Sequence, residues 1–165
     1  MLTVATAGVG ALKGLLTNKS GVHAQLQARL AAENRTIIDV PEAKVAVGHY
    51  TLDAADRAIG GKYPQMYVYC ERMENSLVQK FQRFSGTLDL IIELRHSSDR
   101  LETLEEESQY YLEALLSVLE NSRGEWGDGY YFGGKYEVRF EPAKPGGRHF
   151  VQTLKVKVSV QVHIA

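Results

Sequence analysis

The sequence predicts an α+β fold in which a mostly antiparallel, mixed sheet carries helices on one face. Apolar and polar residues alternate through residues 154–164, and a second alternating run precedes His96. A segment with helical periodicity, residues 99–122, lies between these two runs. Because each alternating strand has only one apolar face, we expect two layers, with water or a partner on the other side of the sheet.

The strongest of these patterns is the alternation over residues 154–164. Side chains on a strand point to opposite faces in turn, so the run predicts a long strand with one apolar and one polar face. The polar face has no acidic residue and consists of Lys155, Lys157, Ser159, Gln161 and His163.

The N-terminal region, residues 1–34, is predicted to be helical. Two helices, over about residues 3–16 and 21–33, are separated by a turn rich in Asn, Ser and Gly. In the second helix Val22, Leu26 and Leu30 recur every four residues and form a narrow apolar stripe. Residues 36–40 and 43–47 are two candidate strands on either side of Pro41.

The region from residue 65 onward predicts a regular order of elements. A strand over residues 65–73 is followed by a turn at residues 74–76 and a long strand over residues 77–96. Gly86 within the long strand indicates a bulge or bend. Asp99 and Glu102 fit a capping box at the start of the helix. The apolar stripe of that helix is formed by Leu101, Leu104, Ser108, Tyr111, Leu112, Leu115 and Leu119.

After Gly124, which ends this helix, residues 125–134 form an aromatic, glycine-rich loop. A strand over residues 136–140 and a turn over residues 142–147 then lead into the final strand.

Length and composition predict a single domain over residues 1–165, in which a helical segment, residues 1–34, is followed by a sheet-containing segment, residues 35–165. The chain has 24% charged and 44% hydrophobic residues, and its net charge of -1 argues against a dedicated nucleic-acid binder. Cys70 is the only cysteine, which excludes an internal disulfide and favours a reducing compartment. We expect neither a signal peptide nor a membrane span, because the N-terminus has no basic leader and Lys13 interrupts its apolar run.

The search for catalytic motifs predicts that the chain is not an enzyme and holds no metal or cofactor. Residues 96–99 contain the residue types of a hydrolase triad, but a helix start explains them better, since sequence neighbours rarely adopt triad geometry. Cys70 falls on the inward side of its strand and is expected to be a buried hydrophobe. No phosphate loop, dinucleotide fingerprint or zinc-binding helix is present.

Charge is distributed unevenly along the chain. Arg100 is the one basic residue between Asp99 and Glu120, whereas every Lys, Arg, Asp or Glu after Pro142 is basic: Lys144, Arg148, Lys155 and Lys157. One interpretation is ordinary scatter on a solvated surface. The other is electrostatic complementarity, in which the basic strand of one subunit faces acidic groups of a neighbour. Contact of the basic hairpin with DNA is a third, weaker interpretation.

The aromatic loop supplies further candidates for a partner surface. Trp126 is expected to pack beneath the C-terminus of the helix, whereas aromatic residues on loops are favoured anchors for protein partners. The predicted interface residues are Tyr130, Tyr131, Lys144, Arg148, Lys155 and Lys157.

The layout of residues 63–165 resembles that of the neck and tail-completion proteins of tailed bacteriophages, and is most similar to the tail terminators. The resemblance lies in the segments 63–69 and 84–93, the helix ending near Trp126, and the Pro-Gly hairpin with its terminal strand. It implies a non-catalytic, homohexameric ring that caps the tail tube and joins the tail to the head connector. The implied partners are other copies of the chain, the tube protein and a connector or neck protein, with a passing contact to DNA in the lumen. The implied location is the virion, after assembly in the host cytoplasm.

Two other functions stay open at the level of the sequence. A neck adaptor or head-closure protein would share the fold and the lack of catalysis, but would bind the portal side. A small cytoplasmic ligand-binding or enzymatic α+β domain would need a closed pocket with convergent polar groups, and the sequence contains no such cluster.

Overall fold

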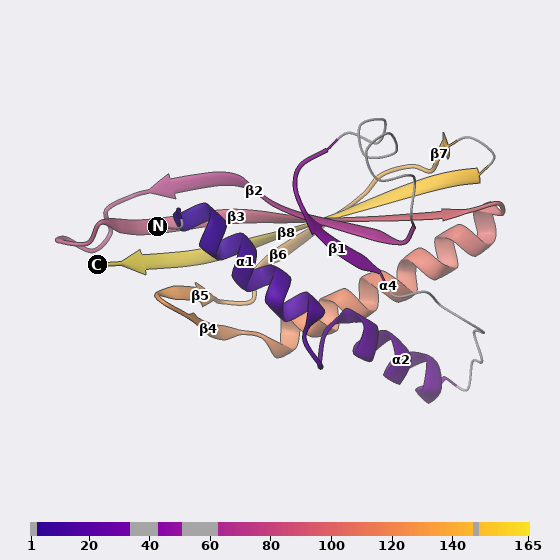
Figure 1. Cartoon of the computed structure of the whole chain (residues 1–165), viewed down its shortest axis with the longest axis horizontal. Coiled ribbons are helices and arrows are strands. Elements are labelled where there is room, and N and C mark those ends of the chain that lie inside the picture. The colour runs from indigo at the N-terminus through magenta and orange to yellow at the C-terminus, as the bar shows by residue number, and fades with distance from the viewer. Residues whose placement is uncertain (1–2, 34–42, 51–62, 147–148) are drawn as a thin grey trace.

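A computed structural model describes residues 3–33, 43–50, 63–146 and 149–165 and confirms the α+β class (Figure 1). The candidate strand at residues 36–40 lies outside the described residues. The helices are α1 (Val4–Thr17), α2 (Val22–Ala32) and α4 (Leu101–Asn121). The strands are β1 (Lys44–Val47), β2 (Gln65–Asn75), β3 (Phe84–Ser98), β4 (Gly124–Gly127), β5 (Tyr130–Phe132), β6 (Tyr136–Phe140), β7 (Lys144–Gly146) and β8 (His149–Ile164).

Both N-terminal helices form where the sequence predicts them. The side chain of Thr3 caps α1 by accepting a hydrogen bond from the backbone N–H of Thr6 at 3.2 Å. Helix α2 begins after Gly21 and buries the stripe formed by Val22, Leu26 and Leu30. The apolar stripes therefore hold α1 against the sheet and α2 against α4.

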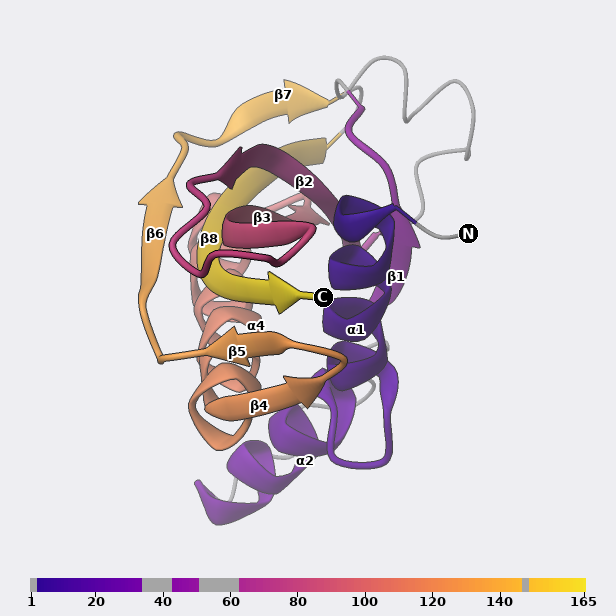
Figure 2. The same cartoon turned by 90° about the vertical axis from the view of Figure 1, so that its left-hand side faces the viewer.

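The described strands form one mixed sheet in the order β1-β2-β3-β8-β5-β4, with β6 and β7 also paired to β8. Strand β1 runs parallel to β2, and every other described pair is antiparallel, as predicted. Strand β8 pairs with β3 along its whole length on one edge and with β7, β6 and β5 in succession on the other. The sheet curls as a result, and β6 lies across the molecule from α1 (Figure 2).

The core lies between the helices and one face of this sheet. Helix α4 contributes the predicted stripe, including Leu115 and Leu119, except for Leu101, which is exposed at the start of the helix. The sheet contributes alternate residues such as Ile92 and Val158. These side chains are fully buried. The terminal alternation is thus confirmed, with its valines in the core.

Several sequence predictions need correction around β3 and α4. The long strand begins at Phe84 and not at Leu77, because residues 76–83 form the loop between β2 and β3. The bulge lies between Cys70 and Arg72 in β2, whereas Gly86 makes a close backbone approach in which a Cβ would lie 1.8 Å from the carbonyl oxygen of Glu74. The capping box is also wrong, since α4 has Arg100 at its N-cap and no side-chain cap.

The predicted aromatic loop is instead a short hairpin formed by β4 and β5. Gly127 and Gly129 adopt positive φ angles on either side of Asp128, which lets the chain reverse tightly. The Trp126 indole donates a hydrogen bond to the carbonyl oxygen of Ser122 at 2.8 Å. This contact confirms that Trp126 packs at the C-terminal end of α4.

The second face of the sheet is not simply solvated, as the sequence had suggested. Residues 48–50 lie against it, with the His49 ring stacked on Tyr69 at a centroid distance of 3.8 Å. Tyr69, Glu93 and Arg95 are buried on this face. The helices therefore lie on one face of the sheet, as predicted. On the opposite face, residues 48–50 cover the middle of the sheet.

We expect replacement of Leu115 by alanine to lower the free energy of unfolding by about 2–5 kcal/mol, because the side chain is fully buried between α4 and the sheet. Urea denaturation followed by circular dichroism would measure this loss. Met73→Ala on β2 is the matched control and should change stability by less than about 0.5 kcal/mol, since Met73 is 54% exposed. Equal losses in the two variants would contradict this packing.

Candidate functional surface

The polar face of β8 is neutralised by acidic residues of the same chain. The Nζ of Lys155 lies 3.1 Å from a carboxylate oxygen of Glu141 and 3.6 Å from one of Glu93. The Nζ of Lys157 lies 3.2 Å from Asp89 and 3.4 Å from Glu71. Hydrogen bonding to Asp89 is the main reason that the pKa of Lys157 is raised. The acidic groups opposite these lysines therefore come from β2, from β3 and from Glu141 after β6.

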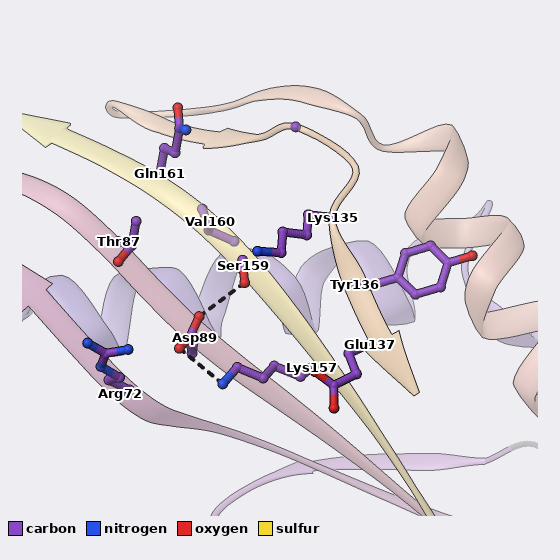
Figure 3. Close-up of a pocket in the computed structure, with 11 residues that line it drawn as sticks. Arg72, Thr87, Asp89, Lys135, Tyr136, Glu137, Lys157, Ser159, Val160 and Gln161 are labelled. Atoms are coloured by element: carbon purple, nitrogen blue, oxygen red, sulfur yellow. Dashed lines mark hydrogen bonds and ion pairs between the residues drawn. The ribbon is translucent and has the colours of Figure 1, made fainter. Parts of the chain in front are cut away.

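A hollow of about 510 Å³ lies over this face between β3, β8 and the start of β6 (Figure 3). Its charged groups are largely engaged with neighbours: Asp89 accepts a hydrogen bond from Ser159 at 3.1 Å and also binds Lys157. Arg72 is paired with Glu74, and Glu137 with Arg139. The residues that line the hollow include neither histidine nor cysteine. The hydroxyl of Ser159 donates to Asp89, which Lys157 also binds, so both side chains belong to the ion-pair network of the sheet.

A buried polar cluster lies beside this hollow, on the same face. The Tyr69 hydroxyl donates a hydrogen bond to Glu93 at 2.7 Å, and Arg95 forms an ion pair with Glu93 at 2.7 Å. Arg95 also donates to the carbonyl oxygen of Tyr50 and lies 4.7 Å from the centre of the Tyr67 ring. The cluster fixes residues 48–50 onto the sheet, which is a structural role.

The carboxylate of Glu93 stays ionised in this buried position. Burial alone would raise its pKa, but hydrogen bonds from Tyr69 and Arg95 and the positive charges of Arg95 and Lys155 outweigh this effect and lower the pKa. The pKa of Tyr69 is raised, first by burial and then by its hydrogen bond to Glu93.

Two histidines have partners that the sequence did not reveal. His96, from the rejected triad-like segment, binds Glu107 and thereby joins β3 to α4. The Nδ1 of His163 lies 2.8 Å from the hydroxyl of Ser85. Ser85 is fully buried and also accepts a hydrogen bond from the N–H of Gln79 at 3.0 Å. The Ser85 hydroxyl is thus buried between the half-buried His163 and the β2–β3 loop, and it helps to hold that loop in place.

The β2–β3 loop is the feature of the surface that sequence reasoning missed. Leu77, Val78 and Phe81 are all strongly exposed, and Phe81 is 103% exposed. Leu77 and Phe81 adopt positive φ angles of 47° and 70°, which non-glycine residues rarely do. We refer to residues 76–83 as the hairpin tip. In the sequence, the signal for this surface was a run of polar residues that contains these three apolar ones.

Hydrogen bonds hold the hairpin tip in this conformation. The side chain of Asn75 accepts from the N–H groups of Ser85 at 3.0 Å and Leu77 at 3.4 Å, and donates to the carbonyl oxygen of Arg83 at 3.4 Å. The tip is thus a bonded turn that presents apolar side chains outward, and exposed apolar groups of this kind mark interaction sites.

The predicted interface residues do not form one surface. Tyr131 is exposed on β5, but Tyr130 is 3% exposed and donates a hydrogen bond to the carbonyl oxygen of Val4 at 2.8 Å. Tyr130 therefore belongs to the protomer core. Lys144 and Lys155 share a second hollow of about 280 Å³, whereas Lys157 lines the larger one. Arg148 lies outside the described residues.

No group of three or more His, Cys, Asp or Glu side chains that could hold a metal ion occurs among residues 3–33, 43–50, 63–146 and 149–165. Within the same ranges, no helix combines the length and apolar character that crossing a membrane requires.

We expect Glu93→Ala to lower the free energy of unfolding by about 3–5 kcal/mol, because it leaves the buried guanidinium of Arg95 without its ion-pair partner. Glu137→Ala is the matched control, because it breaks a pair with Arg139 that is exposed to solvent, and it should have little effect. Urea denaturation of both variants would measure the difference. Similar losses would mean that the buried cluster does not stabilise the fold.

The lowered pKa of Glu93 predicts a loss of stability in acid. The unfolded carboxyl takes up its proton below about pH 4.3, while the folded carboxylate stays charged. The contribution of the Glu93 carboxylate to the free energy of unfolding is therefore complete above that pH. It declines as the pH falls through the lower pKa of the folded state. Denaturation curves between neutral pH and acid should show a shallower decline for Glu93→Gln than for the wild type. Parallel declines would contradict the lowered pKa.

No family model matches the sequence, and no curated protein matches it. Among solved structures, the chain is similar to a component of the virion of a native gene transfer agent particle. The identity is 16%, the alignment covers 86% of this chain and 91% of that chain, and the TM-score is 0.42.

Proposed function

We propose that this chain is a structural, non-enzymatic protein of a phage-like virion. More specifically, we propose a tail terminator that folds as one domain over residues 1–165. Its ring, with six copies as the expected number, would cap the tail tube and join the tail to the head connector. The layout of residues 63–165, which resembles that of tail-completion proteins, supports this proposal.

The observation that carries the proposal is the exposed apolar hairpin tip. Leu77, Val78 and Phe81 face solvent in the protomer although a hydrogen-bonded turn holds them in place. Such side chains are costly in a soluble monomer and favourable when a partner covers them. The tip therefore supports a role in assembly.

The polar groups of the sheet also support the proposal, because they are paired within the chain. The charged groups of this face bind one another or nearby residues of the chain, as Glu93 and Asp89 do with Lys155 and Lys157. The hydroxyl of Ser85, which contacts His163, is fully buried. Enzyme sites usually leave such groups free to bind a ligand, whereas those that line the hollow here bind one another. Satisfied networks of this kind favour a scaffold over a catalyst.

Light scattering coupled to size-exclusion chromatography, with negative-stain microscopy, tests this function. We expect discrete rings, either free in solution or at the ends of purified tail tubes. A protein that stays monomeric at high concentration and leaves tubes uncapped would overturn the proposal. Rings that bind portal complexes and not tubes would instead identify a neck adaptor or head-closure protein.

A further inference from the structure

The hairpin tip combines apolar side chains with positive charge. Lys80 lies between Val78 and Phe81 in this exposed loop and makes no ion pair with any residue that the structure describes. A partner that covers the tip must therefore offer both an apolar contact and a negative charge.

A surface of this kind lies at the first turns of α4. Leu101 is 51% exposed, and Glu102 and Glu105 are exposed beside it. Glu102 and Glu105 are three residues apart on the helix and so share one side of it. Neither forms an ion pair within the described ranges of the chain. We refer to Leu101, Glu102 and Glu105 as the α4 entrance.

The hairpin tip and the α4 entrance cannot meet within one protomer. Strand β3 separates them, with the tip before Phe84 and the helix start after Ser98. A strand of 15 residues spans roughly 50 Å. Figure 1 shows the two features at opposite ends of the long axis.

We propose that the hairpin tip of one copy docks on the α4 entrance of the next copy. Phe81 and Val78 contact Leu101, and Lys80 lies near Glu102 and Glu105. Because the two surfaces differ, the contact is heterologous and passes from copy to copy, which is the arrangement that a ring requires. This inference rests on the proposed ring function and names the surfaces that build it.

The complementarity of the two ends favours a second copy as the occupant. Every copy carries one basic, apolar hairpin tip and one acidic, apolar α4 entrance, so each tip has one entrance available to it. A second acidic apolar site, Tyr131 with Glu125 and Asp128, lies on the β4–β5 hairpin. It is near the tip end of the molecule, because Tyr131 pairs with Gln161 of β8.

Substitutions at the tip should reduce assembly without unfolding the protomer. We expect Phe81→Ser to weaken self-association roughly tenfold or more, as for a central interface anchor. Phe140→Ser is the matched control, since Phe140 is also exposed but belongs to neither surface. Light scattering over a concentration series measures association, and circular dichroism confirms that both variants fold.

A charge exchange tests the pairing of the two surfaces directly. Lys80→Glu and Glu105→Lys should each weaken association, and the double variant should recover it partially. The same exchange with Glu125→Lys in place of Glu105→Lys should give no recovery. Recovery with Glu125→Lys would move the docking site to β4 and β5 and overturn the α4 entrance.

Disulfide trapping tests the contact by its geometry, because a bond forms only where the two thiols come close together. In a Cys70→Ala background, protein with Val78→Cys is mixed with protein carrying Leu101→Cys and oxidised. We expect cross-linked dimers in the mixture and few in either protein alone.

The outcomes separate this inference from the ring function. Wild-type rings that are unaffected by the tip and entrance variants, and that give no cross-link, would overturn the docking contact alone. A wild-type protein that never assembles, even on tail tubes, would overturn both.

Discussion

Hydrogen bonding by β8 along both of its edges is the constraint on which the rest of the structure depends. One edge pairs with β3 from Phe84↔Ile164 to Ser98↔Phe150, and the other holds β7, β6 and β5. Because side chains alternate, this register places the valines against the helices and the lysines on the other face. A slip of one residue would exchange the two sets. The register between β3 and β8 therefore determines both the core and the polar face of the sheet.

The polar face shows how the chain tolerates charge in and beside its sheet. Desolvation of Glu93 and Arg95 is costly and is offset by their mutual ion pair, by Tyr69 and by the nearby Lys155. Lys157 is matched in the same way by Asp89 and Glu71. The charges of this face are therefore balanced largely within the protomer.

The regular elements could be predicted because their signals are local. The stripe of Val22, Leu26 and Leu30 and the alternation over residues 154–164 each specify an element without tertiary information. Three apolar residues in a polar run were a signal for the hairpin tip, but its conformation could not be predicted, since Asn75 and Ser85 define it by hydrogen bonds across the loop. Burial of Glu93 and Arg95 was also hidden, because residues 48–50, far away in sequence, cover them. Both features depend on contacts between residues that are apart in sequence, which local patterns do not reveal.

The place of β8 in the chain has a consequence for biosynthesis. This strand follows every one of its pairing partners in sequence, so the sheet cannot close while they emerge from the ribosome. Until β8 arrives, β3 keeps an open edge and β5, β6 and β7 have no neighbour on the side that β8 will occupy. Open strand edges invite pairing with other chains. The nascent protein therefore passes through a period in which self-association of the wrong kind competes with folding, and rapid docking of β8 ends that period.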